Sequence, residues 1–328
     1  MLLFLETLVV LRILNLFFIS YLMLEIYQKT LSEIIDFEGI GLHSGKKVNL
    51  RILPSVENSG VIFKRTDIEK NNVIKADFRN VASTKLCTTL ENSYGVKIST
   101  VEHLLAAIYI SGIDNVIIEV NNFEVPIMDG SAKDFLEKIK KQKLTNLKSK
   151  RKYLKILDQI NLIDGTKEIE ITPNNSFEID FQLNYKNQII GKQRNLVDFE
   201  SGLTEEIYSS RTFCLYEDIE AIKKMGLAKG GSLENAVVVD NEKVLNKEGL
   251  RNPKEFVNHK ILDLAGDFLL SGYRIIGKVK CKEGGHELSN KFLKEIFKNP
   301  KSFSIVSTKE NVETYKKSED SIALAATA

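Results

Sequence analysis

EFVNHKILDLAGDFLLS, residues 255–271, is an apolar stretch that ionisable side chains interrupt at regular intervals. Its apolar residues predict a largely buried helix. His259, Asp263 and Asp267 stand at i, i+4 and i+8, so the first two lie on one face of that helix. Ionisable groups on a buried helix are costly unless they are paired or bind a metal. The spacing therefore favours two metal ligands, His259 and Asp263; an i,i+4 charge pair on a solvated face is the alternative.

A second helix with a histidine near its start is predicted for residues 99–110, STVEHLLAAIYI. Thr100 is its expected N-cap. His103 is the candidate for the third ligand, because it occupies the place in this helix that His259 occupies in the other. A His–His–Asp set leaves a fourth position open for water, which is typical of a catalytic zinc site. Glu102, beside His103, is then the candidate base.

The elements around these two helices occur in the same order twice. Each helix is followed by a glycine, a strand, a loop that contains glycine and a further helix. Apolar patterns predict strands at residues 47–53, 60–64, 115–121, 153–157, 168–172, 177–183, 236–239 and 274–281, and further helices at 131–141, 217–226 and 286–298. We therefore expect an α+β fold of two similar halves, each a sheet with helices, packed face to face with the metal site between them.

Composition along the chain divides it into a series of segments. They are an apolar leader (1–22), an N-terminal α+β domain (23–140), a lysine-rich linker (141–152), a C-terminal α+β domain (153–300) and a tail expected to be disordered (301–328). The leader is long enough to cross a membrane, but Glu6 and Arg12 interrupt it and it lacks the features of a signal peptide. We expect translation to start at Met23, with a membrane anchor as the alternative.

The overall composition excludes several classes of protein. The 328 residues carry a formal net charge of +2, with 46 lysines and arginines against 44 acidic residues. This near-balance argues against nucleic-acid binding, which normally requires a basic surface. The three cysteines have no metal-binding spacing, so we expect a reducing compartment, the cytoplasm. We also expect no integral membrane role and a monomer.

Three further segments place glycine beside polar residues. GIGLHSG (39–45) and KGGS (229–232) are similar to loops that cradle anions, although neither matches a nucleotide-binding fingerprint. His286 follows two glycines at the expected start of a helix. That position tends to lower the pKa of an imidazole, and a simple helix cap is the alternative role.

A set of motifs in one order covers residues 25–300. They are GIGLHSGKKV (39–48), STVEHLLAA (99–107), GIDNVIIEV (112–120), EVPIMDGSA (124–132), SRTF (210–213), GLAKGGS (226–232), VNHKILDLAGD (257–267) and GGHELSNK (284–291). Together they resemble the UDP-3-O-acyl-N-acetylglucosamine deacetylases, the zinc amidases that commit bacteria to lipid A synthesis. So many motifs in a fixed order make this resemblance specific.

The resemblance implies a metal centre and the groups that move protons around it. The implied ligands of one Zn²⁺ per chain, with Fe²⁺ as the alternative ion, are His103, His259 and Asp263. Glu102 is the implied general base. His286 is the implied proton donor to the leaving amine, and Asp267 orients it.

The resemblance also implies residues that contact the substrate, a UDP-activated acylated amino sugar. Thr212 would help to stabilise the oxyanion, and Lys260 would meet the diphosphate or the developing charge. Phe213 and Leu215 would bind substrate near the passage for the acyl chain. Cys214 stands where the family usually has glycine, and Leu215 where phenylalanine is frequent. These departures leave the preferred acyl length open.

The implied reaction is hydrolysis of the N-acetyl group of UDP-3-O-[(3R)-hydroxyacyl]-N-acetylglucosamine to acetate and the free amine. A non-catalytic binder of UDP-sugars or lipid precursors is a second hypothesis, and a zinc peptidase is a third. A base beside the metal ligands argues against the binder. The sequence lacks the HExxH pattern of many zinc peptidases, which argues against the third.

Overall fold

The computed structural model describes residues 26–307, and its N-terminal half is built on a five-stranded sheet. The strands lie in the order β2 (Ile35–Ile40), β3 (Lys47–Pro54), β9 (Val116–Val120), β4 (Val61–Arg65) and β5 (Val73–Lys75). Along β3, Val48, Leu50 and Ile52 are fully buried while their neighbours face outward. The sheet therefore turns one face to the core, as the period-two pattern predicts.

A small sheet and two helices complete the N-terminal half. The 3₁₀ turn η1 (Phe78–Asn80) leads into the small sheet of β6 (Val81–Ser83), β7 (Thr89–Glu91) and β8 (Lys97–Ser99). The helices are α2 (Glu102–Ile110) and α3 (Lys133–Lys140). Residues 102–109 of α2 are all buried, so protein surrounds this helix on every side.

The centre of the C-terminal sheet is β19 (Arg274–Lys282). It pairs in parallel with β11 (Lys152–Ile156) and β14 (Phe177–Asn184), and antiparallel with β13 (Lys167–Thr172). Further strands extend the sheet: β12 (Ile160–Asp164) beside β13, β15 (Lys192–Asp198) beside β14, and β20 (Phe303–Ser307) beside β11. This sheet thus mixes parallel and antiparallel pairs.

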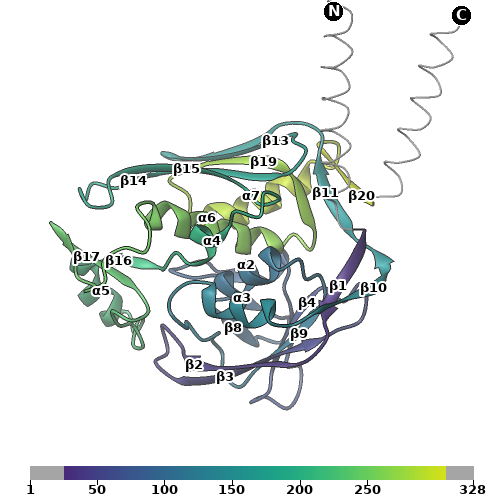
Figure 1. Cartoon of the computed structure of the whole chain (residues 1–328), viewed down its shortest axis with the longest axis horizontal. Helices are drawn as coiled ribbons and strands as arrows, with labels where there is room; N and C mark the ends of the chain where they lie inside the picture. Colours follow the sequence, from purple (N-terminus) through teal and green to yellow (C-terminus); the bar gives the residue numbers. More distant parts are fainter. Residues whose placement is uncertain (1–25, 308–328) are drawn as a thin grey trace, which may run out of the picture.

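The C-terminal half also carries helices and a small insert. Its helices are α4 (Glu205–Tyr208), α6 (Glu255–Leu269) and α7 (His286–Lys298). The insert consists of β16 (Phe213–Leu215), η2 (Tyr216–Asp218), α5 (Ile219–Lys224), β17 (Val237–Asp240) and β18 (Lys243–Val244). In Figure 1 it projects to the left, beyond the N-terminal end of α6.

Figure 1 shows the two main sheets on the outside with the helices between them. From bottom to top lie the N-terminal sheet, α2 with α3, then α6 with α7, and the C-terminal sheet. The backbones of α2 and α6 are in close contact at Gly266 of α6, where a Cβ atom would lie 2.0 Å from the backbone oxygen of Glu102. The predicted α+β class is confirmed, and this arrangement is consistent with two halves packed face to face.

Two segments that were expected to be irregular contain strands. Within the predicted linker lies β10 (Leu144–Lys150), which pairs antiparallel with β1 (Tyr27–Leu31). The division into domains at residues 141–152 stays a prediction. The tail was expected to be disordered from residue 301, which is wrong for β20, because this strand pairs with β11 along its whole length. Residues 308–328 and the leader lie outside the described residues.

The start of α2 also differs from the prediction. Thr100 is the predicted N-cap, but the residue before the helix is Val101, and no side chain caps it. Thr100 adopts a φ of 58°, in the left-handed region. Its hydroxyl donates to Glu124 Oε1 at 3.3 Å. Thr100 therefore attaches the loop before α2 to a buried carboxylate, and the capping prediction is wrong.

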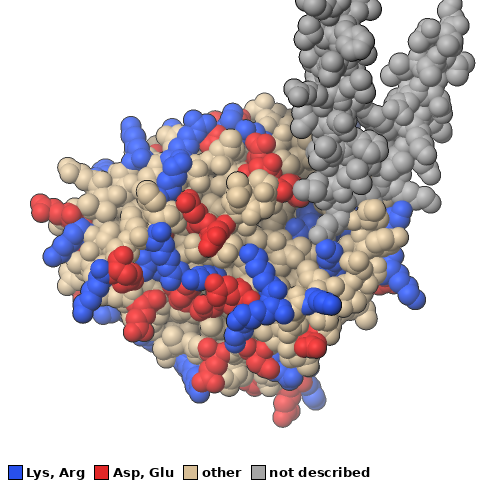
Figure 2. All heavy atoms as spheres, in the orientation of Figure 1, with Lys and Arg blue, Asp and Glu red and all other residues tan. Residues whose placement is uncertain are grey.

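Acidic and basic side chains are interspersed over the face of the molecule in Figure 2. On this face, side chains of both signs therefore lie beside each other. Within residues 26–307, no helix combines the length and the apolar character that a membrane crossing requires.

Candidate active site

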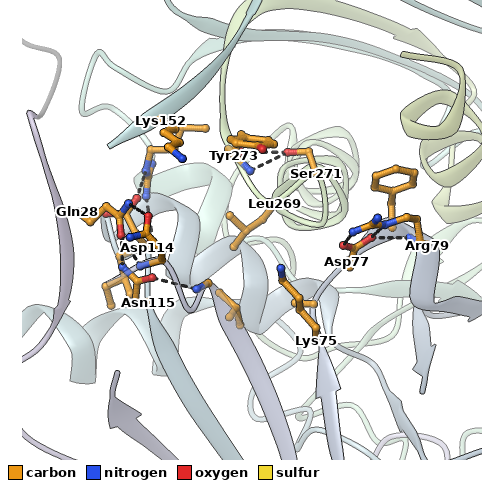
Figure 3. Close-up of a pocket in the computed structure, with 18 of the residues that line it drawn as sticks. Gln28, Lys75, Asp77, Arg79, Asp114, Asn115, Lys152, Leu269, Ser271 and Tyr273 are labelled. Atoms are coloured by element: carbon orange, nitrogen blue, oxygen red, sulfur yellow. Dashed lines mark hydrogen bonds and ion pairs between the residues drawn. The ribbon is translucent and has the colours of Figure 1, made fainter. Parts of the chain in front are cut away.

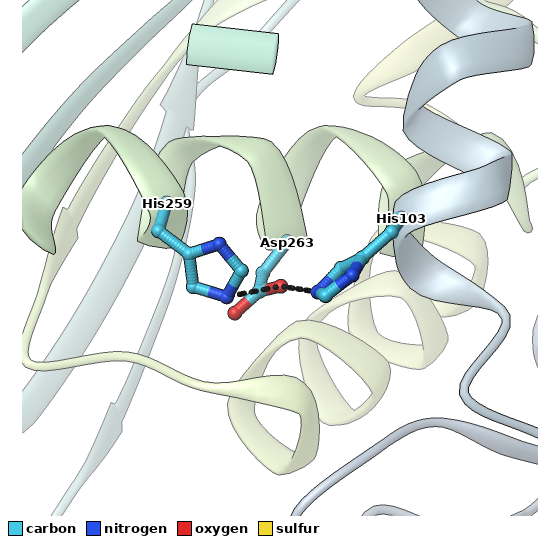
Figure 4. A group of neighbouring side chains, drawn as sticks. All are labelled: His103, His259 and Asp263. Carbon is cyan, nitrogen blue, oxygen red and sulfur yellow. Dashed lines mark ion pairs between the residues drawn. The ribbon is translucent and has the colours of Figure 1, made fainter. Parts of the chain in front are cut away.

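The three predicted metal ligands meet between the two central helices. His103 lies in the first turn of α2, and His259 and Asp263 lie on successive turns of α6. Figure 4 shows both imidazoles directed at the Asp263 carboxylate. Asp263 Oδ1 is 3.5 Å from His103 Nε2 and 3.4 Å from His259 Nε2. One candidate ligand atom from each residue lies within 4.8 Å of the other two, so all three can bind the same cation.

The protonation of these groups fits a metal site. His259 Nδ1 lies 3.1 Å from the backbone oxygen of Ser210, so Nδ1–H donates there and the Nε2 lone pair faces Asp263. Burial lowers the pKa of His259 to about 3, which keeps the imidazole neutral. Asp263 Oδ1 is buried and has no hydrogen-bond partner among the described residues. A cation between two imidazole lone pairs and this oxygen satisfies all of them.

Lys260 neutralises the other side of the same carboxylate. Its Nζ lies 2.7 Å from Asp263 Oδ2. Burial opposes the ionisation of Asp263, but His259 and Lys260 outweigh it and hold its pKa well below the ordinary value. Asp263 is therefore an anion, as a metal ligand must be. The structure thus places Lys260 at the His–His–Asp cluster, whereas the resemblance implied a role with the substrate.

Glu102 and His286 lie next to the cluster and face each other. Glu102 Oε1 is 3.6 Å from His286 Nε2, and His286 Nδ1 is 2.9 Å from Asp267 Oδ2. Burial raises the pKa of Glu102, which suits a group that accepts a proton. Burial opposes a charge on His286, but Asp267 and Glu102 outweigh it and raise its pKa to about 9. The helix N-terminus was expected to lower that pKa, and these carboxylates reverse the expectation.

Thr88 is a site residue that the sequence did not reveal. Its backbone N–H donates to Glu102 Oε2 at 3.1 Å, and its hydroxyl donates to Asp267 Oδ1 at 2.7 Å. It precedes β7 in a run of small polar residues, Cys87-Thr88-Thr89. A threonine in such a run has no pattern that would single it out.

Thr212 and Phe213 follow a buried arginine that fixes their backbone. Arg211 is 1% exposed, and its Nε donates to Glu255 Oε1 at 2.8 Å. The Thr212 N–H donates to the backbone oxygen of Gly130 at 2.8 Å, so this segment is held to the N-terminal half. The ring centre of Phe213 is 6.2 Å from that of His259. The segment therefore lies beside the His–His–Asp cluster.

Leu215 ends β16, two residues beyond Phe213, and is half-buried. β16 pairs in parallel with β17 of the insert, with Leu215 opposite Val239. Phe213 and Leu215 thus belong to the part of the insert that begins beside the His–His–Asp cluster. The resemblance implies a passage for the acyl chain in this insert.

The two glycine-rich loops pack on each other and enclose a carboxylate of the protein itself. Glu124 is fully buried and accepts the backbone N–H groups of His43 at 2.7 Å and Ser44 at 2.8 Å. The Gly230 N–H donates to the backbone oxygen of Leu42 at 3.0 Å, and a Cβ at Gly230 would lie 2.4 Å from the backbone oxygen of Gly41. The amides expected to cradle an external anion therefore hold Glu124.

A cavity of about 560 Å³ lies elsewhere, near the C-terminal end of α6 (Figure 3). None of the predicted site residues lines it. Several of its polar side chains are engaged with each other: Asn115 Nδ2 donates to Gln28 Oε1 at 2.9 Å, and Arg79 is ion-paired with Asp77 at 2.5 Å. The first contact connects β1 to the start of β9, and the second lies within η1 and the residue that caps it. We therefore place the chemistry at the His–His–Asp cluster.

Comparison with known proteins gives one consistent match. The family model described as UDP-3-O-acyl N-acetylglycosamine deacetylase matches residues 28–298. The chain is 44% identical over 284 residues to the UDP-3-O-acyl-N-acetylglucosamine deacetylase of Pasteurella multocida (strain Pm70), which covers 86% of this chain and 93% of that relative. The protein of the same name from Haemophilus influenzae (strain 86-028NP) is 42% identical, over 86% of this chain and 93% of that relative. The one from Vibrio vulnificus (strain YJ016) is 41% identical, over 88% of this chain and 95% of that relative.

Proposed function

The chain belongs to the UDP-3-O-acyl N-acetylglycosamine deacetylase family, and we propose that its His–His–Asp cluster is the centre at which this deacetylation takes place. The enzyme is an amide hydrolase of lipid A biosynthesis. It removes the N-acetyl group of UDP-3-O-[(3R)-hydroxyacyl]-N-acetylglucosamine and yields acetate and the free amine. The observation that carries the proposed site is the convergence of two imidazoles on Asp263 Oδ1, which has no hydrogen-bond partner within residues 26–307.

Zn²⁺ is the cation that best suits two imidazoles and one carboxylate, with Fe²⁺ as the alternative. His103, His259 and Asp263 would hold it. When bound, such a cation supplies Lewis acidity that polarises the acetamide carbonyl and lowers the pKa of a water molecule.

Glu102 and His286 divide the proton transfers between them. Glu102, which is adjacent in sequence to the ligand His103, accepts a proton from the attacking water as its oxygen bonds to the acetyl carbon. His286, with its pKa raised to about 9, is protonated at neutral pH and gives its Nε2 proton to the sugar nitrogen as the C–N bond breaks. Asp267 accepts the Nδ1–H of His286 and so fixes the direction of Nε2.

The remaining predicted residues act on the substrate. Thr212, held beside the cluster by Arg211, stabilises the oxyanion of the tetrahedral intermediate. Lys260 carries a positive charge, because Asp263 and Tyr185 outweigh burial and raise its pKa. It can therefore meet the diphosphate or the developing charge. Phe213 and Leu215 bind the substrate near the acyl passage.

Two alternatives fit the site less well. A non-catalytic binder of UDP-sugars has no use for a buried base and a buried imidazolium beside a metal cluster. A zinc peptidase commonly places both histidines on one helix as HExxH, whereas here they come from α2 and α6. We further propose that the enzyme acts as a cytoplasmic monomer without an integral membrane role and does not bind nucleic acid.

The test is acetate release by the purified full chain. The protein is stripped with a chelator, reloaded with one equivalent of Zn²⁺ or Fe²⁺, and supplied with UDP-3-O-acyl-N-acetylglucosamine. We expect stoichiometric acetate and free amine from the reloaded protein and none from the stripped protein. UDP-N-acetylglucosamine, which lacks the acyl chain, is the matched control and should react far more slowly. Binding without acetate release would support the non-catalytic hypothesis and overturn the proposal.

A further inference from the structure

Thr88 connects the two halves of the molecule at the proposed site of proton transfer. It lies in the N-terminal half, immediately before β7, and is 1% exposed. Its hydroxyl donates to Oδ1 of Asp267, which lies on α6 in the C-terminal half, at 2.7 Å. Hydrogen bonds to ionised groups are short and about twice as strong as neutral ones, so this contact can restrain the carboxylate.

Asp267 is held at both of its oxygens. Oδ1 accepts the Thr88 hydroxyl, and Oδ2 lies 2.9 Å from His286 Nδ1. A carboxylate held at one oxygen can still turn about its Cβ–Cγ bond, whereas two bonds from opposite sides fix its plane. The plane of Asp267 in turn sets the direction of the imidazole that donates to it.

The backbone of Thr88 contacts the second carboxylate that faces His286. The Thr88 N–H donates to Glu102 Oε2 at 3.1 Å, and Glu102 Oε1 lies 3.6 Å from His286 Nε2. A single residue therefore contacts Asp267 on the Nδ1 side of the imidazole and Glu102 on its Nε2 side. Movement of Thr88 would change the distance between the proposed base and the proposed acid.

We propose that Thr88 is a positioning residue for the deacetylation, which holds Asp267, and through it His286, in register with Glu102. This inference rests on the proposed function of the site. The hydroxyl is the part of Thr88 that a substitution can remove alone, because the N–H to Glu102 belongs to the backbone. At 1% exposure no bulk water replaces the lost donor, so Asp267 Oδ1 would be left without it.

The test compares three variants of the full-length enzyme loaded with Zn²⁺. Thr88→Val keeps the shape of the side chain and removes the hydroxyl, while Thr88→Ser keeps the hydroxyl. Thr89→Val is the matched control, because it removes the hydroxyl of the next residue, which donates to Ser99 Oγ at 3.0 Å and not to the site. We expect Thr88→Val to lower kcat roughly 10-fold with KM within about twofold of the parent. Thr88→Ser should recover most of that loss, and Thr89→Val should match the parent.

Two further measurements separate positioning from a general structural role. In an Asp267→Asn background, Thr88→Val should lower kcat by less than about twofold, because its effect passes through Asp267. In the metal-free protein, the NMR resonance of the proton shared by His286 Nδ1 and Asp267 should shift or broaden in Thr88→Val and not in Thr89→Val.

The proposal is overturned if Thr88→Val stays within twofold of the parent kcat or if Thr88→Ser is as slow as Thr88→Val. It is also overturned if Thr88→Val lowers kcat as much in the Asp267→Asn background as it does in the parent. An unmoved His286 resonance in Thr88→Val overturns it as well. If the parent enzyme releases no acetate, the proposed function fails. The resonance then still tests whether Thr88 restrains Asp267 and His286, so the two failures are distinct.

Discussion

Asp263 is the centre of the His–His–Asp cluster, since both imidazoles and Lys260 converge on its carboxylate. Asp263→Ala should abolish tight binding of zinc and leave the helices in place, because the substitution removes the one anionic ligand. Metal per chain measured after gel filtration, with circular dichroism for the fold, checks this. The matched control is Asp164→Ala, which removes a carboxylate whose side chain is 45% exposed and paired with Lys291. One equivalent of tightly held zinc in Asp263→Ala would refute the ligand assignment.

Substitution of Glu102 should affect activity without affecting metal binding. Glu102→Gln should retain zinc and lose activity by about 10²- to 10⁴-fold, because an amide cannot accept the proton of water. The rate of acetate release and the zinc content of the same preparation check both parts. Glu287→Gln, at the exposed first turn of α7, is the control and should keep the parent rate. A Glu102→Gln enzyme within about threefold of the parent would remove Glu102 from the role of base.

The residues that could be predicted from the sequence are those whose chemistry is rare in this chain. The chain has only four histidines in 328 residues, so the i,i+4 pair His259–Asp263 was informative, and the structure brings this pair together with His103. The roles of Thr88 and Glu124 could not be predicted in the same way. Threonine and glutamate are common side chains, and the partners of these two are distant in sequence. Thr88 donates to Asp267, and Glu124 accepts the backbone N–H of His43.

At the scale of elements, the close approach of α2 and α6 depends on Gly266. A Cβ there would lie 2.0 Å from the Glu102 backbone oxygen and 3.1 Å from the Ala106 nitrogen, both on α2. Gly266→Ala should therefore push the helices apart, lower the free energy of unfolding by about 1–3 kcal/mol and weaken zinc binding. Urea unfolding and zinc titration check these effects.

The control for Gly266→Ala is Gly285→Ala. Gly285 has an extended φ of −172°, and a Cβ added there would meet no heavy atom within 4 Å. Its substitution should change the free energy of unfolding by less than about 0.5 kcal/mol. Equal stability of the two variants would contradict the steric argument at Gly266.

Elements with a strong periodic pattern could be predicted, and those that depend on a distant partner could not. The bounds of α7 agree with the prediction, and α6 ends within two residues of it. By contrast, the sequence of β10, LTNLKSK, is polar and typical of a linker. It becomes a strand because it pairs with β1, more than a hundred residues earlier in the chain.

At the scale of the whole molecule, an ion pair between the halves should make stability depend on pH. Arg251, just before α6, donates to Asp129 Oδ2 at 2.7 Å, and Ser131 donates to Oδ1. Burial raises the pKa of Asp129, but these hydrogen bonds outweigh it and lower the pKa below the ordinary value of 3.8. A carboxyl with a lowered folded-state pKa contributes stability above its unfolded-state pKa and loses it as pH falls through the folded-state value.

The free energy of unfolding of the parent should therefore exceed that of Asp129→Asn by an amount on the order of 1 kcal/mol at neutral pH. The difference should diminish as pH falls below about 4, where the carboxylate of the unfolded chain is already protonated. Urea titrations of both proteins across the acid range measure it. A difference that does not change with pH would show that the Asp129–Arg251 contact has no net electrostatic effect.

The division of the proposed metal ligands between α2 and α6 has a consequence for biosynthesis. When the ribosome has synthesised only the N-terminal half, the nascent chain contains His103 but neither of the other two proposed ligands. His259 and Asp263 are added more than 150 residues later. The metal can then be bound with all three ligands only after α6 has left the exit tunnel and docked on α2. Loading of a metal at the proposed site would thus be a late event that follows correct assembly, and a chain released early by a stalled ribosome would lack two of the three proposed ligands. With the proposed ligand set, the metal bound in a preparation would therefore report only molecules that finished both synthesis and docking.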